Sequence, residues 1–210
     1  MIVAIDGPAG AGKSTVARTL AERLGFRYLD TGAMYRSLTW LALKQGMPLD
    51  DGEPLGKLAA ENPVTFDAEG RVYIDGSDVT SAIRQVRVDR MVPVVARYPE
   101  VRAVMRERQR ELAAEGDAVI EGRDIGTVVA PDAAVKVYLV ADAQVRAARR
   151  QAERPDIGSD ALATDLKLRD ESDRTRMQPA DDAEQIDTTE LDVDEVVARI
   201  EKLVRSRTAA

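Results

Sequence analysis

A glycine-rich stretch near the start of the chain limits its possible folds more than any other feature. Residues Gly7 to Ser14 read Gly-Pro-Ala-Gly-Ala-Gly-Lys-Ser and fit the pattern G-x-x-x-x-G-K-[ST]. The apolar run Ile2 to Ile5 precedes this stretch, and Val16, Leu20 and Leu24 follow it at helical spacing. A strand, a tight turn and a helix in this order bring backbone N–H groups and the positive end of a helix to one point. The sequence therefore predicts a phosphate-binding loop at the end of a strand.

Strands and helices continue to alternate along the chain. Apolar runs predict four further strands, at residues 27–29, 118–120, 135–140 and near Ile186. Apolar residues at helical spacing predict helices from Met34 to about Gly46, from about Gln85 to Glu115 with a break at Tyr98-Pro99, and from Asp192 to Arg205. We therefore expect an α/β fold, with a central parallel sheet of about five strands flanked by helices and ligands beyond the carboxyl ends of the strands.

One segment has a different pattern. Between residues 62 and 81, Val64, Phe66, Val72 and Ile74 alternate with polar residues at period two. This alternation predicts a small antiparallel β unit inserted into the α/β domain.

The composition narrows the chemistry by exclusion. A chain of 210 residues suits one compact domain, and it contains no His and no Cys. Disulfide scaffolds, zinc fingers, thiolate nucleophiles and Ser-His-Asp triads are therefore excluded. The net charge of -7 argues against nonspecific nucleic-acid binding. Because no signal peptide and no run of ~18 apolar residues is present, we expect a soluble, cytoplasmic protein with no membrane partner.

The glycine-rich stretch indicates binding of a nucleoside triphosphate. Lys13 can reach the β- and γ-phosphates, and the Ser14 hydroxyl can coordinate Mg²⁺. An ordinary turn between a strand and a helix is the alternative. Guanine-reading GTPases use an Asn-Lys-x-Asp motif, whereas the only Asn of this chain is Asn62, which precedes Pro63. Motor and helicase ATPases generally need a longer chain, so a small-molecule kinase that uses ATP is favoured.

Two further polar segments follow predicted strands. Residues 30–36 read Asp-Thr-Gly-Ala-Met-Tyr-Arg, and residues 121–124 read Glu-Gly-Arg-Asp. A Gly beside an Arg and an Asp suits close backbone approach, a fork for phosphate and a carboxylate that reads a base. The alternatives are a helix N-cap at Asp30 or Thr31 and a surface turn at 121–124.

Residues 5–15, 29–36 and 121–129 together resemble the bacterial cytidylate kinases, and the layout of the chain is similar from end to end. The resemblance implies a single P-loop kinase domain over residues 1–210. Its expected parts are a core at residues 1–61, 85–145 and 160–210, a β insert at 62–84 in the monophosphate-binding region, and a short lid at 146–159.

The resemblance also implies the reaction and its residues: transfer of a phosphoryl group from ATP to CMP or dCMP by a monomer, with Mg²⁺ held through Ser14. The residues expected to bind ATP are Gly7, Pro8, Ala9, Gly10, Ala11, Gly12, Lys13, Ser14 and Thr15. Those expected to bind the acceptor are Asp30, Thr31, Tyr35, Arg36, Arg102, Arg123, Asp124, Arg169, Asp173 and Arg176. The expected catalytic residues are Lys13, Arg123, Arg149 and Arg150.

Phosphoryl transfer needs positive charge and alignment more than a strong base, so a site without His is chemically acceptable. Lid arginines among Arg146, Arg149, Arg150 and Arg154 would neutralise the transferring group, although each could instead lie on a solvated helix face. We expect the lid and insert to close over both substrates, because an open site would hydrolyse ATP.

The sequence departs from the family at one point and leaves other activities open. Family members often carry Ser where this chain has Pro93. Kinases of UMP, AMP or shikimate are the nearest alternatives, and a noncatalytic nucleotide-binding switch or nucleic-acid-associated regulator is an alternative of another class. The β insert and the Gly-Arg-Asp segment favour the cytidylate interpretation.

Overall fold

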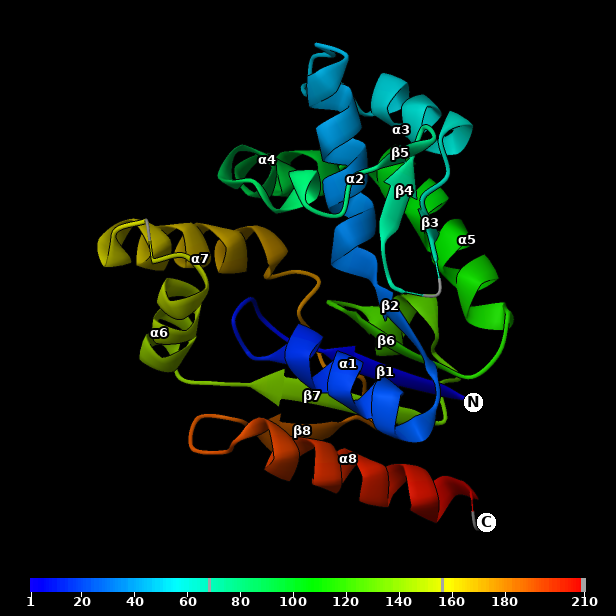
Figure 1. Ribbon diagram of the computed structural model, residues 1–210, viewed down its shortest axis with the longest axis vertical. Coiled ribbons are helices and arrows are strands. Elements are labelled where there is room, and N and C mark those ends of the chain that lie inside the picture. Colours follow the sequence, from blue (N-terminus) through cyan, green and yellow to red (C-terminus); the bar gives the residue numbers. More distant parts are fainter. Residues whose placement is uncertain (68, 156, 209–210) are drawn as a thin grey trace. The chain divides into compact units, whose positions relative to one another are not determined.

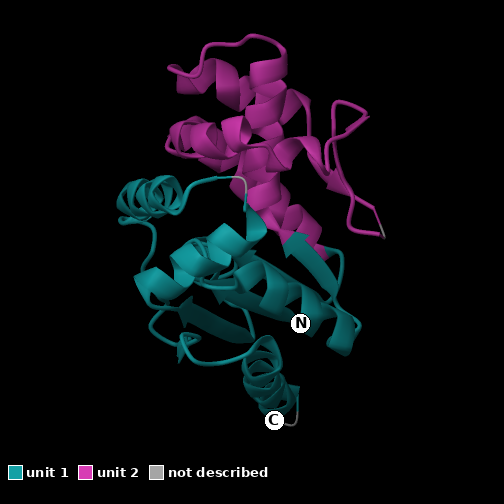
Figure 2. Cartoon of the chain, turned by 60° about the vertical axis from the view of Figure 1, so that its left-hand side comes forward, with its two compact units in different colours: residues 1–29, 115–210 teal, residues 30–114 magenta. Residues whose placement is uncertain are grey.

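The computed structural model describes residues 1–67, 69–155 and 157–208. The chain forms two compact units, coloured separately in Figure 2. Unit 1 contains residues 1–29 and 115–210, and unit 2 contains residues 30–114. The predicted β insert at 62–84 therefore lies in unit 2, and the predicted lid at 146–159 lies in unit 1.

A five-stranded sheet organises unit 1, in the order β2-β6-β1-β7-β8 (Figure 1). Strand β1 pairs in parallel with both β6 and β7, and β7 pairs in parallel with β8. The predicted α/β fold with a central parallel sheet of about five strands is confirmed. The strands are β1 (Ile2–Asp6), β2 (Arg27–Asp30), β6 (Ala118–Gly122), β7 (Val135–Val140) and β8 (Glu184–Asp187).

The pairing register places polar segments at one edge of this sheet. Ile5 lies opposite Glu121 on β6 and Val137 on β7, so these three strands run side by side to their carboxyl ends. Asp6, the last residue of β1, lies opposite Gly122. The loops that follow β1 and β6 therefore begin next to each other.

Helices α1 (Lys13–Leu24) and α8 (Val193–Thr208) share an apolar core with the sheet. Helix α1 ends at Gly25, whose left-handed conformation (φ 67°) lets its N–H reach the last carbonyls of the helix. After β6 the chain makes a π-helical turn, η2 (Ile125–Val129), and α6 (Ala143–Glu153) packs against α7 (Ser159–Asp173). The core between the sheet, α1 and α8 includes Val3, Ile5, Val16, Leu20, Val137, Leu139, Val197 and Ile200.

Unit 2 combines helices with a small antiparallel sheet. Helix α3 packs on α5, and α2 packs on α4. The strands pair in the order β3-β4-β5, so the predicted antiparallel β unit is confirmed. The elements are α2 (Thr31–Lys44), α3 (Gly52–Glu61), β3 (Thr65–Phe66), β4 (Val72–Ile74), β5 (Ser77–Asp78), η1 (Ala82–Arg84), α4 (Val86–Ala96) and α5 (Pro99–Ala114).

Three details of unit 2 bear on the sequence predictions. The break expected at Tyr98-Pro99 separates α4 from α5, whereas α3 was not expected. Helix α2 begins three residues before the expected Met34, because the Asp30 side chain caps it. Pro93 lies inside α4, where it has no N–H to donate to the preceding turn.

Within the described residues, no helix has the length and apolarity needed to cross a membrane.

Candidate active site

The P-loop, residues 7–14, connects β1 to α1 in unit 1. Gly7 has φ 145°, and a Cβ atom placed on it would lie 2.2 Å from the backbone oxygen of Leu139 on β7. Gly12 caps α1 in the left-handed conformation (φ 89°). Both positions therefore require glycine. At Gly7 a side chain would collide with the neighbouring strand β7, and at Gly12 the backbone has a left-handed conformation that favours glycine. The strand, glycine-rich turn and helix thus follow one another as the sequence predicts.

Lys13, the first residue of α1, lies folded into this loop. Its side chain is buried, and Nζ donates a hydrogen bond to the backbone oxygen of Pro8 at 2.7 Å. Burial lowers the pKa of Lys13 well below its ordinary value, and the positive charges of Arg123 and Arg169 lower it further. The acidic side chains of Glu121 and Asp6 act in the opposite direction. An anionic group in the loop would therefore favour the charged form of the Lys13 ammonium.

Arg123, which follows β6, connects the P-loop to the last residue of α7. Its Nη1 donates to the backbone oxygen of Gly7 at 2.9 Å, and its Nε donates to Asp173 Oδ2 at 2.9 Å. Arg176 Nη2 donates to the other carboxylate oxygen, Asp173 Oδ1, at 2.6 Å. Burial alone would raise the pKa of Asp173, but Arg123, Arg176 and Arg169 outweigh it and lower that pKa. Asp173 is thus an ionised anchor that holds two arginines beside the loop.

Asp6 is a buried acid that was not assigned a role from the sequence. Its two carboxylate oxygens accept from the backbone N–H groups of Ile125 and Gly126 at 2.9 and 2.8 Å. Burial raises the pKa of Asp6 to about 6, and the nearby Asp124 raises it, whereas the two amides and Lys13 lower it. These bonds fix the turn that directly follows Asp124. A carboxylate at the buried carboxyl end of a strand is the sequence signal that could have identified it.

Helix α6 contributes two of the predicted lid arginines to the surroundings of the P-loop. Arg146 donates to the Ala9 backbone oxygen at 3.0 Å and pairs with Asp170 on α7 at 2.8 Å. Arg149 donates to the side-chain and backbone oxygens of Thr188 at 3.0 and 2.6 Å. The Thr188 hydroxyl in turn lies 3.1 Å from the Ala11 backbone oxygen, so both arginines are connected to the loop.

The third, Arg150, has a different partner. It pairs with Glu153 on its own helix at 2.8 Å. The Arg150 side chain is 26% exposed, so this pair is partly buried and does not lie on a fully solvated helix face.

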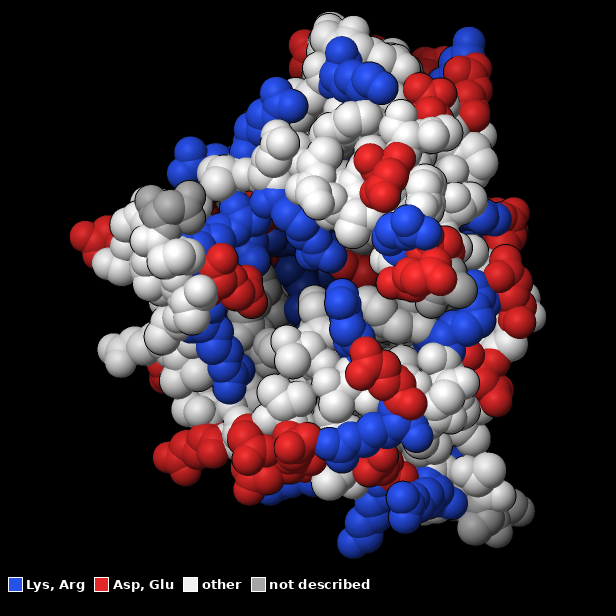
Figure 3. Space-filling model, in the orientation of Figure 1, with Lys and Arg blue, Asp and Glu red and all other residues white. Residues whose placement is uncertain are grey.

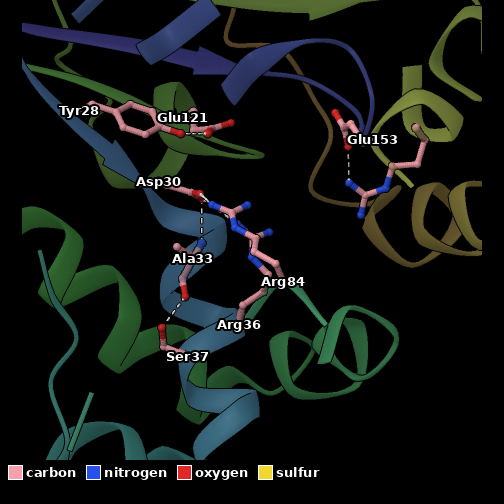
Figure 4. A network of polar contacts seen from close by, with 9 residues as sticks. Tyr28, Asp30, Ala33, Arg36, Ser37, Arg84, Glu121 and Glu153 are labelled. Carbon is pink, nitrogen blue, oxygen red and sulfur yellow. Dashed lines mark hydrogen bonds and ion pairs between the residues drawn. The ribbon is translucent and has the colours of Figure 1, made fainter. Parts of the chain in front are cut away.

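In unit 2, Asp30 lies at the centre of a polar cluster (Figure 4). Its Oδ1 accepts from the Ala33 backbone N–H at 2.7 Å, which caps α2. Arg36 Nη2 lies 3.1 and 3.0 Å from the two carboxylate oxygens, and Arg84 Nη2 lies 2.9 Å from Oδ2. Burial alone would raise the pKa of Asp30, but Arg36, Arg84 and the Ala33 amide lower it. Arg84 was not singled out in the sequence because it lies 54 residues from its partner.

The remaining predicted acceptor residues lie in their separate units. Thr31 is buried at the start of α2, Tyr35 is half-buried one turn later, and Arg102 is half-buried on α5, all in unit 2. Asp124 precedes η2, and Arg169 lies on α7, both in unit 1.

Positive charge collects around the P-loop although the whole chain is acidic. Acidic and basic side chains are interspersed over the face in Figure 3, so the net charge of -7 does not form one acidic region there. Several basic residues of unit 1 contact the loop or are linked to it through Asp173, through Thr188 or through their effect on the pKa of Lys13. They are Lys13, Arg123, Arg146, Arg149, Arg169 and Arg176.

Comparison with known proteins gives consistent matches. The family model for cytidylate kinase matches residues 3–206. The chain is 48% identical to a cytidylate kinase of Shouchella clausii (strain KSM-K16), over 97% of this chain and 95% of that protein. It is 47% identical to a cytidylate kinase of Limosilactobacillus fermentum, over 98% and 97%. A gluconokinase structure from Sinorhizobium meliloti 1021 is similar in fold alone, with a TM-score of 0.53 and 15% identity over 99% of this chain and 93% of that one.

Proposed function

The chain belongs to the cytidylate kinase family, and from this premise we propose how its residues carry out the transfer of the γ-phosphoryl group of ATP to CMP or dCMP. It is a nucleoside monophosphate kinase, and the products of its reaction are ADP and CDP or dCDP. The family match supports the identity of the acceptor. The observation that carries the donor side is the P-loop, with Lys13 folded against its own backbone.

ATP binds with its phosphates in the P-loop, against the backbone N–H groups and the positive end of α1. Lys13 then exchanges the Pro8 oxygen for phosphate oxygens. The negative phosphates offset the burial and the neighbouring arginines that disfavour the Lys13 charge, so the ammonium is protonated during transfer.

Ser14 is the residue that fits a Mg²⁺ ion accompanying ATP. It is exposed in the first turn of α1, directly after the P-loop lysine. In the described residues, no group of three or more acidic side chains could hold a metal. The ion would therefore be held by this hydroxyl, the phosphates of ATP and water. When bound, it supplies positive charge to the transferring phosphoryl group.

The acceptor phosphate is bound by Arg36, Arg123 and Arg176. The last two are already aligned by Asp173, at 2.9 and 2.6 Å. A fixed pair of guanidinium groups stabilises the spread of charge over the equatorial oxygens without reorganising during transfer. The attacking oxygen belongs to the anionic acceptor phosphate, so no strong general base is needed.

The other acceptor residues recognise the nucleoside and close the site. Asp124 accepts from the amino group of cytosine and is positioned by the turn that Asp6 fixes. Thr31, Tyr35 and Arg102 line the acceptor site, and Arg169 with Asp173 faces the sugar. Arg149 and Arg150 reach the transferring group after exchanging their partners Thr188 and Glu153 for phosphate oxygens.

A coupled assay of ADP release with ATP and CMP tests this function. The wild-type chain is expected to release ADP in the presence of CMP and to release little without it. Lys13→Met is the control for the donor site and should lose turnover by at least about 100-fold, because it removes the cation from the phosphates. A wild-type chain that binds ATP and fails to phosphorylate both CMP and dCMP refutes the proposal.

A further inference from the structure

Helix α6 begins against the backbone of the P-loop. A Cβ atom placed on Gly10 would lie 3.0 Å from the Cβ atom of Arg146 and 3.1 Å from the Arg146 backbone oxygen. The Arg146 side chain also reaches the loop, because its Nη1 donates to the backbone oxygen of Ala9 at 3.0 Å. Arg146 lies in the first turn of α6, so a movement of this helix is coupled to the P-loop through Arg146.

A carboxylate of α7 holds Arg146 in this place. Arg146 Nη2 lies 2.8 Å from Asp170 Oδ2, and the two side chains are 12% and 25% exposed. Asp170 precedes Asp173 by three residues, so the two carboxylates lie on the same side of α7. Asp173 anchors Arg123 and Arg176, whereas Asp170 anchors the arginine that contacts the P-loop from α6.

The pair of Arg146 and Asp170 has one contact where its chemistry allows two. Within the residues that the structure describes, Arg146 Nε and Asp170 Oδ1 are buried and have no hydrogen-bond partner. The N–H groups of Nε and Nη2 point to the same side of a guanidinium group and match the two oxygens of one carboxylate. The unused donor and the unused acceptor therefore belong to the same pair. Because buried polar groups without a partner are unfavourable, a rotation that brings Nε to Oδ1 would stabilise the contact between α6 and α7.

Binding of ATP supplies a cause for such a rotation. In the proposed function, Arg149, one turn after Arg146, exchanges the oxygens of Thr188 for phosphate, and closure of the lid moves α6. We propose that Asp170 is a positioning residue of the ATP site. It holds Arg146 on the P-loop in the free protein, and its second bond, from Arg146 Nε to Oδ1, forms when α6 closes over ATP. The inference rests on the proposed function, because it takes ATP as the molecule over which α6 closes.

Calorimetry of ATP binding, in the absence of CMP, tests the inference. A contact that is equally strong in the free and the bound protein cancels from the binding equilibrium, whereas a contact that gains a bond on binding does not. Asp170→Asn removes the charge and keeps the shape of the side chain. It should raise the dissociation constant for ATP about tenfold, which is the effect of one charge-assisted hydrogen bond. Glu171→Gln is the matched control on the same helix, because Glu171 is exposed, and it should leave that constant unchanged.

A double-mutant cycle with Arg146→Lys separates this role from a purely structural one. Lysine keeps the charge but has a single nitrogen and cannot form the fork, so Arg146→Lys should also weaken ATP binding about tenfold. If Asp170 acts through Arg146, adding Asp170→Asn to Arg146→Lys should change the dissociation constant by less than about twofold. A further tenfold loss in the double variant, or an unchanged constant in either single variant, overturns the inference. A wild-type chain that binds ATP and does not phosphorylate CMP or dCMP refutes the proposed function instead, so the two failures are distinguishable.

Discussion

Asp6→Asn should change how the stability of the protein depends on pH. Asp6 is 6% exposed, and burial raises the pKa of its carboxyl from 3.8 to about 6. The folded protein therefore binds the Asp6 proton more tightly than the unfolded chain does. Stability from this group is fully present below about pH 4 and is lost as the pH rises through 6. Asparagine does not titrate, so the variant lacks this loss.

The size of the effect follows from the shift. Each pKa unit corresponds to 1.36 kcal/mol, so a shift from 3.8 to about 6 means that ionised Asp6 destabilises the fold by about 3 kcal/mol. About 2 kcal/mol of this arises between pH 4 and pH 7. Asparagine also leaves one of the Ile125 and Gly126 amides without its carboxylate oxygen, which costs about 1–3 kcal/mol at every pH.

Urea unfolding followed by circular dichroism at pH 4, 5, 6 and 7 measures this term. The free energy of unfolding of Asp6→Asn minus that of the wild type should rise by about 2 kcal/mol from pH 4 to pH 7. Asp187→Asn is the control with the opposite sign, because hydrogen bonds from Thr189 lower the pKa of Asp187. A difference between Asp6→Asn and wild type that stays constant with pH would show that folding does not raise the pKa of Asp6.

Two other predictions concern the P-loop and the helix beside it. Gly7→Ala places a Cβ atom 2.2 Å from the backbone oxygen of Leu139. The variant should therefore lose measurable ATP binding in calorimetry, or its free energy of unfolding should fall by several kcal/mol. A variant that keeps both the ATP affinity and the stability of the wild type would contradict the assignment of the loop. Saturation with ATP and CMP should slow amide hydrogen exchange at least about tenfold over residues 143–155. The reason is that Arg149 and Arg150 would leave Thr188 and Glu153 and bind phosphate oxygens instead. An unchanged rate of hydrogen exchange over these residues would contradict closure of the lid.

The elements that the sequence predicts correctly are those with local signals. The P-loop, its flanking strand and α1 follow from glycines and apolar spacing within 24 residues, and the β unit follows from alternation at period two. Helix α3 has weaker signals, since it contains Gly52, Pro54 and Gly56. Its glycines are explained by close packing, because a Cβ atom at Gly56 would lie 2.9 Å from Glu100 Cβ on α5. Such a contact depends on the tertiary fold.

The site residues divide in the same way. Lys13 lies in the glycine-rich stretch 7–14 and Arg123 lies in the Glu-Gly-Arg-Asp segment 121–124, so the sequence alone suggests that both bind phosphate. Arg84 and Asp6 have their partners 54 and about 120 residues away, so only the folded chain brings these groups together. The sequence also predicts the same role for Arg149 and Arg150, whereas Arg149 contacts Thr188 and Arg150 pairs with Glu153 on its own helix.

This chain transfers a phosphoryl group from ATP to a cytosine monophosphate. The most direct test incubates the chain with ATP, Mg²⁺ and each of CMP, UMP, AMP and GMP in turn, and measures formation of the diphosphate. We expect kcat/KM to be highest for CMP, because in the proposed site Asp124 accepts from the amino group of cytosine, whereas the arginines anchored by Asp173 and Asp30 bind the phosphate that all four monophosphates share. A higher kcat/KM for UMP, AMP or GMP, or no diphosphate from CMP, would contradict this expectation.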